Sequence, residues 1–596
     1  MTIRIGEVVA VHGVKITLRI DDDSSKEVLF YDGERFKGVS IREYVLIQRG
    51  FRDLVCIVEG EHLDESRIDS SNGKSVYIRR VDVRPIGYFD GESFQHGIKY
   101  LPMIRDPAFL ASERRVTAIF DRGLITDDFT IGRMLKEDIP ISLPWKRLFN
   151  GHIGIFGNTG SGKSNTLAKL YTVLFDRKLA IVAQKSRFVV LDFNGEYVGD
   201  QFTAADQKAI YRLSTRGGQP GLSGDRFPLR ADEFWELETL SLLFQATTNT
   251  QRPFLNRLIE GRKRYLNAPN ALTNFAKTSF RRAFCAGSPK SATLDLMRTV
   301  ARELNNEPLI AYLKEVSWHS TQQKFFIPGQ NIWFEADGSS YDHHVGPLVD
   351  QFDAANLDHF AQLTLRVHLQ LIRDLVSGYV QFEHIQPLLK RVEASLIQLR
   401  CVLDVGEDSA TQRPLTIVSF RRCSNEIKKV LPLLLAKQYY NGHKDAVGTP
   451  PDRTVHLIID EAHNILSDQS SRESENWKDY RLELFEEIVK EGRKFGVFVT
   501  VSSQRPADIS PTIVSQLHNF FIHRLINDRD LALVDNTITT LDAVSRGLIP
   551  GLAQGCCVVT GTAFDIPMVL QVDRLEKAKQ PNSDDVDLEA LWAGTA

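Results

Sequence analysis

A glycine-rich segment is the first part of the chain whose residue types and spacing could support chemistry. Residues 157–164 read G-N-T-G-S-G-K-S, which fits the phosphate-loop pattern G-x-x-x-x-G-K-[ST]. Its glycines let backbone N–H groups surround a phosphate without Cβ clashes, and the helix that follows adds its positive end. We therefore expect bound ATP, with Lys163 neutralising the β- and γ-phosphates and Ser164 binding Mg²⁺. The residues expected to contact the nucleotide are Gly157, Asn158, Thr159, Gly160, Ser161, Gly162, Lys163, Ser164 and Asn165.

Two adjacent carboxylates form the second candidate group. Asp460 and Glu461 end the apolar run Val455–Ile459. In such a pair the first carboxylate suits the Mg²⁺ shell, and the second, directed at the γ-phosphate, suits polarisation of an attacking water. This arrangement favours an ATP hydrolase over a small-molecule kinase, which needs an acceptor pocket instead. We expect His463 to be a coupling or structural residue rather than a metal ligand.

A further acidic segment follows the apolar run Phe188–Leu191. It reads D-F-N-G-E, with Asp192 and Glu196 as its carboxylates and Gly195 permitting a sharp exit from the strand. Two interpretations stay open. The segment is a structural turn alone, or its two carboxylates support the nucleotide site from the edge of the sheet.

Polar residues at the two ends of the strand Val497–Ser502 complete the candidate site. Gln504 follows this strand and is suited to sensing a γ-phosphate. Arg493, before the strand, and Arg505, after it, are alternative arginine fingers that would reach the ATP of a neighbouring subunit. A solvated, charged helix end is an equally weighted interpretation of Arg493.

Strands must bring these residues to one place. Apolar runs, each followed by a turn or helix signal, predict a parallel sheet buried on both faces and therefore an α/β fold. The runs are His152–Phe156, Phe188–Leu191, Leu415–Phe420, Val455–Ile459 and Gly496–Ser502. Between residues 205 and 410 helical spacing replaces this pattern and predicts a helical insertion. Strands return at Gly555–Thr560 and Met568–Val572.

The N-terminal part of the chain has a different pattern. Short runs rich in Val, Ile and Tyr, separated by Gly and Asp turns, predict a small closed β-barrel. These runs are Ile3–Val11, Val14–Ile20, Tyr44–Arg49, Leu54–Glu59 and Ser75–Arg84. The expected domains are 1–95, the barrel; 96–204, a linker and the first part of the ATPase core; 205–410, the helical insertion; 411–575, the second part of the core; and 576–596, a polar tail.

Composition limits the class of protein. The 596 residues include 73 Lys and Arg and 76 Asp and Glu, and 42% are hydrophobic. These values exclude a mostly disordered chain and argue against a uniformly basic nucleic-acid coat. A local basic surface, such as Arg262–Arg264, stays open, although a solvated helix face is the commoner explanation of such a run. The 6 cysteines form no C-x-x-C pair and no apolar run is long enough to span a membrane, so we expect a cytoplasmic protein that does not enter a membrane.

The motifs occur in an order that is itself informative. With GNTGSGKS, LDFNGEY, LIIDEAH, KEGRKFG and SSQRP in succession, the sequence resembles the HerA family of hexameric ATPases, in the HerA/FtsK branch of DNA translocases. The resemblance implies a RecA-like core, an assembly barrel, a homohexamer and double-stranded DNA threaded through a central channel. It favours Glu461 as the catalytic carboxylate, Gln504 as the sensor and Arg493 as the trans-acting arginine. The chain departs from the family at Gly151, which precedes His152 at the start of the phosphate-loop strand. Relatives often carry arginine at this position.

The resemblance also indicates a function. It implies a hexameric ATP-hydrolysing motor that translocates on or unwinds double-stranded DNA. Relatives work with a separately encoded nuclease or sirtuin-like NAD-hydrolysing effector, in DNA processing or anti-phage defence. The alternative is a nucleotide-switched hexameric scaffold that activates a partner enzyme with little DNA movement of its own. A net charge of −3 is compatible with both.

Overall fold

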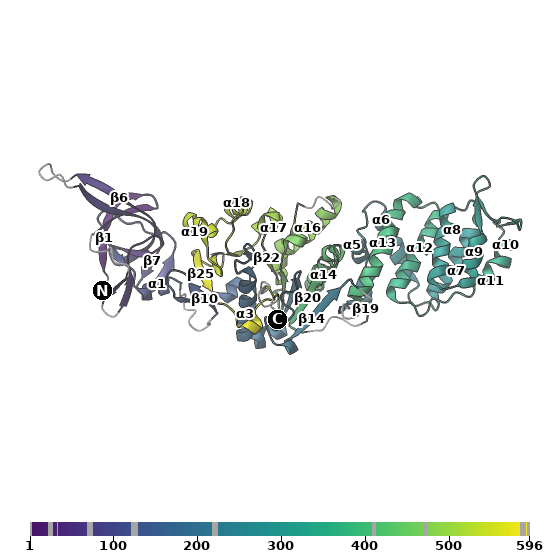
Figure 1. Ribbon diagram of the computed structural model, residues 1–596, viewed down its shortest axis with the longest axis horizontal. Coiled ribbons are helices and arrows are strands. Elements are labelled where there is room, and N and C mark those ends of the chain that lie inside the picture. The colour runs from purple at the N-terminus through teal and green to yellow at the C-terminus, as the bar shows by residue number, and fades with distance from the viewer. Residues whose placement is uncertain are drawn as a thin grey trace.

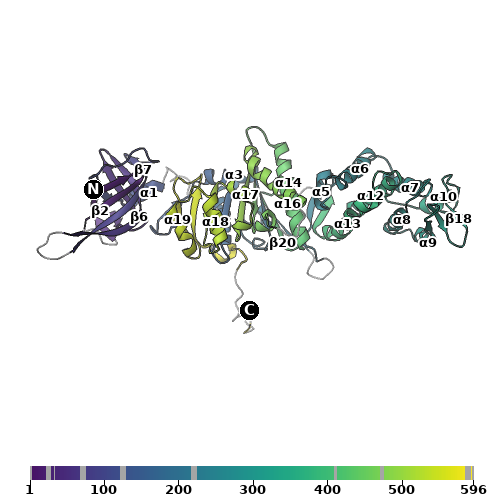
Figure 2. The same cartoon turned by 90° about the horizontal axis from the view of Figure 1, so that it is seen from above.

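The computed structural model is elongated, and its three parts follow one another along the long axis (Figure 1). A β-barrel with the N-terminus lies at one end, a large sheet with its helices lies in the middle, and a helical region lies at the other end. The view turned by 90° has the same order of parts (Figure 2). The structure describes residues 3–21, 28–31, 34–67, 75–120, 129–216, 224–407, 413–469, 475–583 and 592.

The N-terminal sheet closes on itself. Its strands pair in the order β2-β1-β9-β5-β6-β7, and β7 pairs back with β2, so the predicted barrel is confirmed. The barrel strands are β1 (Arg4–His12), β2 (Lys15–Ile20), β5 (Tyr44–Arg49), β6 (Arg52–Arg67), β7 (Ser75–Asp90) and β9 (Pro107–Leu110). Alternate residues, among them Val45, Ile47 and Leu54, fill its interior, as the twofold repeat of a strand requires.

The expected end of the barrel at residue 95 is wrong. β9 lies beyond that point and inserts between β1 and β5, because the barrel cannot close without a strand at this place. Three shorter strands flank the barrel: β3 (Val28–Tyr31), β4 (Glu34–Lys37) and β8 (Ser93–His96). The helix α1 (Glu113–Phe120) then leads toward the central sheet.

The central sheet has 11 strands in the order β11-β10-β25-β24-β23-β12-β22-β21-β13-β20-β14. The strands from β23 to β14 run parallel, and the others are antiparallel. Their bounds are β10 (Thr130–Met134), β11 (Pro140–Ser142), β12 (Ile153–Phe156), β13 (Ser186–Asp192), β14 (Lys208–Ser214), β20 (Leu415–Arg422), β21 (Thr454–Ile459), β22 (Val497–Ser503), β23 (Asn519–Ile522), β24 (Cys556–Gly561) and β25 (Met568–Val572).

Both faces of this sheet are buried, as the continuous apolar runs predict. The long helix α3 (Lys163–Lys185) packs Leu167 and Leu170 into one core together with Ile153 of β12. On the other face α14 (Asn425–Ala446) and α16 (Glu475–Glu491) pack against β13, β21 and β22 in a second core. The parallel strands therefore have only their ends available for polar chemistry.

The helical insertion is present, but it starts later than residue 205. β14, which has 7 residues, belongs to the central sheet because it pairs with β20 in parallel. The insertion is joined to the core by β15 (Phe227–Arg230) and β19 (Leu403–Gly406), which pair in parallel. It holds α4 (Ala231–Phe234), α5 (Leu237–Leu243), α6 (Gln251–Arg264), α7 (Ala271–Phe284), α8 (Ser291–Glu303), α9 (Glu307–Glu315), α10 (Ser339–His344), α11 (Gly346–Val349), α12 (His359–Val376) and α13 (Phe382–Val402), with the small strands β16 (Ser317–His319), β17 (Lys324–Ile327) and β18 (Ile332–Trp333).

The core also includes shorter helices. They are α2 (Trp145–Phe149), α15 (His463–Leu466), α17 (Pro511–Ser515), α18 (Asp528–Thr537) and α19 (Ala543–Leu548). The segment after β25 returns to the core, where the backbone N–H of Asn582 donates to the carbonyl of Glu196 at 2.9 Å. Among the described residues, no helix combines the length and apolar character that crossing a membrane requires.

Candidate nucleotide site

Strand order brings the candidate residues together. β12 carries the phosphate loop, β21 carries Asp460 and Glu461, and β22 lies between them with Gln504 just beyond its end. Phe156 pairs with Ser503, and Ile459 pairs with Val501, so all three strands finish at the same level. The carboxyl edge of a parallel sheet is where ligands bind in such folds, and the predicted residues meet there.

The phosphate loop is held open by its glycines. Gly160 and Gly162 have φ values of +74° and +104°, which a residue with a Cβ rarely adopts. A Cβ on Gly162 would also lie 2.8 Å from the backbone N of Gly555. Gly555 donates its N–H to the carbonyl of Ser161 at 2.8 Å, and Asn158 donates its N–H to the carbonyl of Arg524 at 3.0 Å. The loop is thus fixed by backbone contacts from distant segments.

Lys163 lies among the acidic residues of β21. Its Nζ is 3.1 Å from Oε1 of Glu461 and 3.4 Å from Oδ1 of Asp460, and it donates to Ser502 Oγ at 3.2 Å. Ser502 in turn donates to Asp460 at 2.9 Å. Burial opposes the charge on Lys163, but the two carboxylates outweigh it and raise the pKa of the amine. The Lys163 ammonium group, which is expected to bind phosphate, therefore neutralises the buried carboxylates of Asp460 and Glu461 in this structure.

Glu461 is the most constrained residue of the site. Its φ of 47° lies in the left-handed region, where a non-glycine residue is strained. Gln504 donates to its Oε1 at 2.8 Å, and His463 Nδ1 lies 3.3 Å from its Oε2. Burial would raise the pKa of Glu461, but the hydrogen bond from His463 and the charge of Lys163 lower it to about 2. Glu461 is therefore held as a weakly basic carboxylate.

Gln504 joins the two halves of the site. Its amide nitrogen donates to Glu461, while its amide oxygen accepts a hydrogen bond from the Thr159 hydroxyl in the phosphate loop. One side chain thus bonds both the phosphate loop and the Glu461 carboxylate. The role of Gln504 as a γ-phosphate sensor stays a prediction.

The structure separates the roles of Asp192 and Glu196. The Asp192 carboxylate is fully buried and accepts backbone N–H groups of Gly195 at 2.7 Å, Glu196 at 3.1 Å and Tyr197 at 3.1 Å, so it holds the turn. Burial, followed by the charge of Asp460, raises the pKa of Asp192 to about 7. Glu196 is placed by this turn beside Ser164, its Oε1 accepts a hydrogen bond from Asn194 at 3.2 Å, and burial raises its pKa as well. Asp192 thus forms the structural turn, and Glu196 reaches the site.

The acidic residues fit a divalent cation. Asp460 Oδ2 and Glu196 Oε2 are buried oxygens without a hydrogen-bond partner, and Ser164 lies beside Glu196. No group of three or more Asp, Glu, His or Cys among the described residues could hold a metal by itself. Mg²⁺ is commonly bound by one or two protein carboxylates together with substrate phosphates and water. Ser164 and Asp460, with Glu196 nearby, are therefore suited to hold Mg²⁺ on a nucleotide.

Two of the predicted residues, Arg493 and Asn165, have side chains that contact other segments rather than the phosphate loop. Arg493 lies in a short 3₁₀ turn before β22, with its Nη1 3.5 Å from Nε2 of His518, at the amino edge of the sheet opposite the phosphate loop. The Asn165 side chain donates to the carbonyl of Asp573 at 3.2 Å and accepts from Leu575 N at 3.3 Å. The Asn165 side chain therefore bonds the segment after β25, and its expected contact with the nucleotide stays a prediction. Arg505, at the nucleotide edge, is exposed.

Sequence reasoning missed residues that support the loop. Ser502 contacts Lys163 and lies in the SSQRP motif, where only Gln504 and Arg505 were singled out. Gly555 and Arg524 contact the loop backbone and lie outside the quoted motifs. His523 is completely buried directly beneath the loop, where burial lowers its pKa to about 4. Its position after β23 becomes informative only once β23 is known to lie beside β12.

The sequence of the chain is similar to those of known proteins. A family model described as the central domain of the helicase HerA matches residues 129–318. The DNA double-strand break repair helicase HerA of Sulfurisphaera tokodaii is 22% identical over 86% of this chain and 81% of its own length. The protein of the same name from Sulfolobus acidocaldarius is 22% identical over 92% of this chain and 88% of its own.

The structure of the chain also has similarity to solved structures. VirB4 of Thermoanaerobacter pseudethanolicus matches with a TM-score of 0.41 and 12% identity, covering 76% of this chain and 98% of that one. The plasmid coupling protein TrwB in complex with ADP and Mg²⁺ matches with a TM-score of 0.40 and 12% identity, covering 76% of this chain and 91% of that one.

Proposed function

We propose that the chain is a member of the HerA family of ATPases, and that it is an ATP-hydrolysing motor that translocates on or unwinds double-stranded DNA. The observation that carries the proposal is the cluster around Lys163, in which the phosphate-loop lysine contacts Asp460 and Glu461 directly. Such a lysine and carboxylate pair serves water attack on a γ-phosphate. The names of the relatives supply DNA as the molecule on which the motor acts.

Nucleotide binding would change the state of Glu461. Lys163 leaves the carboxylates when ATP phosphates enter the loop, because they offer it a larger negative charge. The loss of that neighbouring cation removes one cause of the low pKa of Glu461 and makes the carboxylate a better base. Glu461 then takes a proton from water as the water oxygen bonds to the γ-phosphorus and the bond to the β–γ bridging oxygen breaks. Bound Mg²⁺ supplies charge neutralisation on the phosphate oxygens.

Arg493 extends the proposal to an assembly. Its place at the amino edge of the sheet supports a role at the ATP of another copy, as in a homohexamer, rather than at its own. Mixing Arg493→Ala protein with Lys163→Ala protein tests this role. Each variant alone is inactive, and the mixture should regain hydrolysis, since an Arg493→Ala subunit keeps its phosphate loop and receives arginine from its neighbour. A mixture that remains as inactive as its components contradicts a trans-acting Arg493.

The partner forms part of the proposal. A separately encoded nuclease or NAD-hydrolysing effector would use the hexamer in DNA processing or defence, with the barrel as the docking face. The barrel lies at one end of the elongated molecule, beside the central sheet, which supports its use as a docking face (Figure 1).

One experiment separates the motor from a scaffold. The ATP hydrolysis rate is measured with and without long duplex DNA, with Glu461→Gln protein as the blank. Strong stimulation by duplex DNA supports the motor. A hydrolysis rate that is the same with and without DNA, or hydrolysis that starts only when a partner is added, contradicts the motor. Either result favours a nucleotide-switched scaffold.

A further inference from the structure

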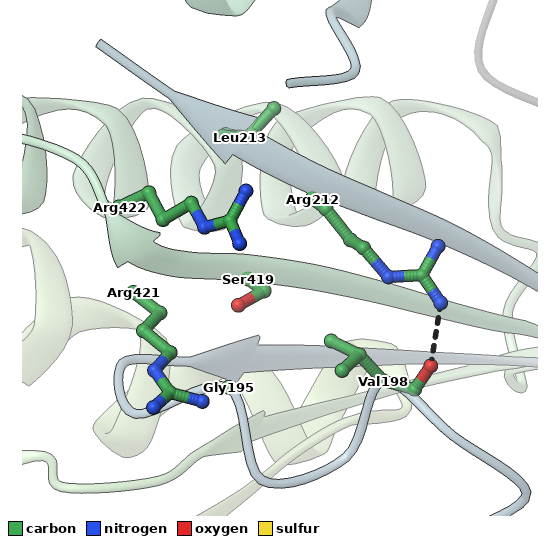
Figure 3. A pocket seen from close by; sticks show the side chains of 7 residues that line it. All are labelled: Gly195, Val198, Arg212, Leu213, Ser419, Arg421 and Arg422. Carbon is green, nitrogen blue, oxygen red and sulfur yellow. Dashed lines mark hydrogen bonds between the residues drawn. The ribbon is translucent and has the colours of Figure 1, made fainter. Parts of the chain in front are cut away.

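A pocket of about 400 Å³ lies on the carboxyl edge of the sheet, beside the nucleotide site. It is formed by the ends of β14 and β20 and by the turn after β13, and Arg212, Arg421 and Arg422 line it (Figure 3). No motif in the sequence analysis covers these arginines. The pocket therefore needs an explanation separate from the phosphate loop.

The pocket gathers positive charge without neutralising it. Arg212 donates to the carbonyl of Val198 at 2.8 Å, a bond that adds no negative charge. Within the described part of the chain, the Arg421 and Arg422 side chains have neither a salt bridge nor a hydrogen bond. The Asp225 carboxylate, the acid on the adjoining segment, accepts the backbone N–H of Arg212 at 2.8 Å. Residues 217–223 read G-G-Q-P-G-L-S and supply no carboxylate by sequence.

The backbone around the pocket accommodates these long side chains. Gly195 has a φ of +77°, and a Cβ on it would lie 2.8 Å from Cδ of Arg421. The absence of a side chain at Gly195 therefore leaves the space through which the stem of Arg421 passes. Arg421 and Arg422 are the last residues of a strand in a rigid sheet, so their starting points are fixed. The helix α14 begins just beyond them and adds its positive end at the same edge.

The pocket is too far from the phosphate loop to share its phosphates. β20 lies four strands from β12 in the sheet. At a spacing of about 4.8 Å per strand, the two strand ends are about 19 Å apart. Gly195 belongs to the same turn as Glu196, so the two sites are adjacent through this turn but do not overlap.

We propose that the pocket is a second phosphate site, which takes a phosphate group of a larger ligand rather than the nucleotide of the phosphate loop. Guanidinium groups match the geometry of phosphate oxygens and remain charged at any physiological pH. An anion also relieves the repulsion among three cations whose side chains form no salt bridge with a described residue. The backbone of duplex DNA is the source that the proposed function supplies, and on this point the inference rests on that function. A free nucleotide offers the same chemistry and forms the second arm of the test.

The DNA arm uses the double variant Arg421→Gln/Arg422→Gln in the full chain. The matched control is Arg216→Gln/Arg226→Gln, which removes the same charge from exposed arginines of the neighbouring segment that do not line the pocket. Binding of a labelled duplex is measured over a series of salt concentrations. The pocket variant should bind several-fold more weakly and lose about one to two units of the salt slope, while the control keeps the slope of the unaltered protein. Equal slopes in both variants overturn DNA as the ligand.

The nucleotide arm uses Lys163→Ala protein, in which the phosphate loop is disabled. Calorimetric titration with pyrophosphate and with ADP should detect residual binding that disappears when Arg421→Gln/Arg422→Gln is added. Binding in this arm without a DNA effect assigns the pocket to a free nucleotide. If the unaltered protein binds no DNA at all, the proposed function fails, and this arm still tests the pocket by itself.

The proposal is overturned when neither arm distinguishes the pocket variant from its control. The single change Arg422→Gln guards against a folding defect, because Arg422, unlike Arg421, is not packed over Gly195. It should reproduce about half of the slope change while its thermal unfolding matches that of the unaltered protein. A slope change in a protein that no longer unfolds cooperatively counts against a phosphate site.

Discussion

Two charged regions lie on the same edge of the same sheet and are organised in opposite ways. Around Lys163 opposite charges are buried within 3.4 Å of one another and neutralise each other. Around Arg421 and Arg422 charges of one sign are exposed and have no partner among the residues that the structure describes. The first arrangement is a resting state that a ligand must displace. The second stays charged until a ligand arrives.

The difference follows from where each charge is held. An isolated charge inside a protein costs several kcal/mol, so Lys163, Asp460 and Glu461 tolerate burial only as a group. Exposed guanidinium groups remain hydrated and need no partner for folding. Substitutions in the two regions should therefore affect different measured quantities.

Glu461→Gln should have the largest effect. Glutamine keeps the shape of the side chain but cannot take a proton from water, so hydrolysis should fall about 1000-fold while ATP binding persists. Steady-state hydrolysis and binding of a fluorescent ATP analogue measure the two properties. Normal hydrolysis by this variant would show that another group is the base.

Lys163→Ala should weaken ATP binding and also destabilise the nucleotide-free protein. It leaves Asp460 and Glu461, 0% and 4% exposed, without their cation, which costs about 3 kcal/mol. Thermal unfolding without nucleotide measures this loss. Adding Glu461→Gln to Lys163→Ala removes one of the two unpaired charges and should restore part of the stability. An unfolding midpoint equal to that of the unaltered protein would contradict the pairing.

The low pKa of Glu461 predicts a pH dependence. Because this pKa is lowered to about 2, the ionised group contributes stability above pH ~4.5, its value in the unfolded chain, and loses it as the pH falls toward 2. Between pH 5 and pH 3 the stability difference between the unaltered protein and Glu461→Gln should shrink by about 2 kcal/mol. Denaturant unfolding at several pH values measures it. A constant difference would mean that Glu461 is not paired.

Arg422→Gln should have the smallest effect on stability. The residue is exposed and its side chain has no hydrogen bond or salt bridge to another residue that the structure describes, so the unfolding free energy should change by no more than about 0.5 kcal/mol. Thermal unfolding beside Lys163→Ala provides the comparison. A loss as large as that of Lys163→Ala would show that Arg422 has a structural partner, and the contrast between the two regions would no longer hold.

Much of the nucleotide site could be predicted from local pattern. The spacing of Gly157, Gly160, Gly162 and Lys163 is sufficient to indicate a phosphate loop, and the apolar runs that precede the loop and Asp460 identify their strands. These features depend on neighbouring residues in the chain. The barrel was predictable for the same reason, because short alternating strands are a local property.

Errors occurred where distant segments meet. The barrel boundary missed β9, and the insertion boundary missed β14, since both strands join sheets whose other strands lie far away in the sequence. The bonds of the Asn165 side chain to Asp573 and Leu575 were not predicted for the same reason, because the segment after β25 meets α3 only through the tertiary fold.

The sequence by itself determined which loops can bind phosphate, which carboxylates end strands and which segments are buried. These are consequences of glycine conformation, charge and hydrophobic periodicity, all of them local. Tertiary structure alone decided that β22 lies between β12 and β21, that Arg493 faces away from its own phosphate loop, and that three arginines share a pocket. Strand order decides such contacts, and it depends on packing between residues far apart in the chain, which no local pattern records.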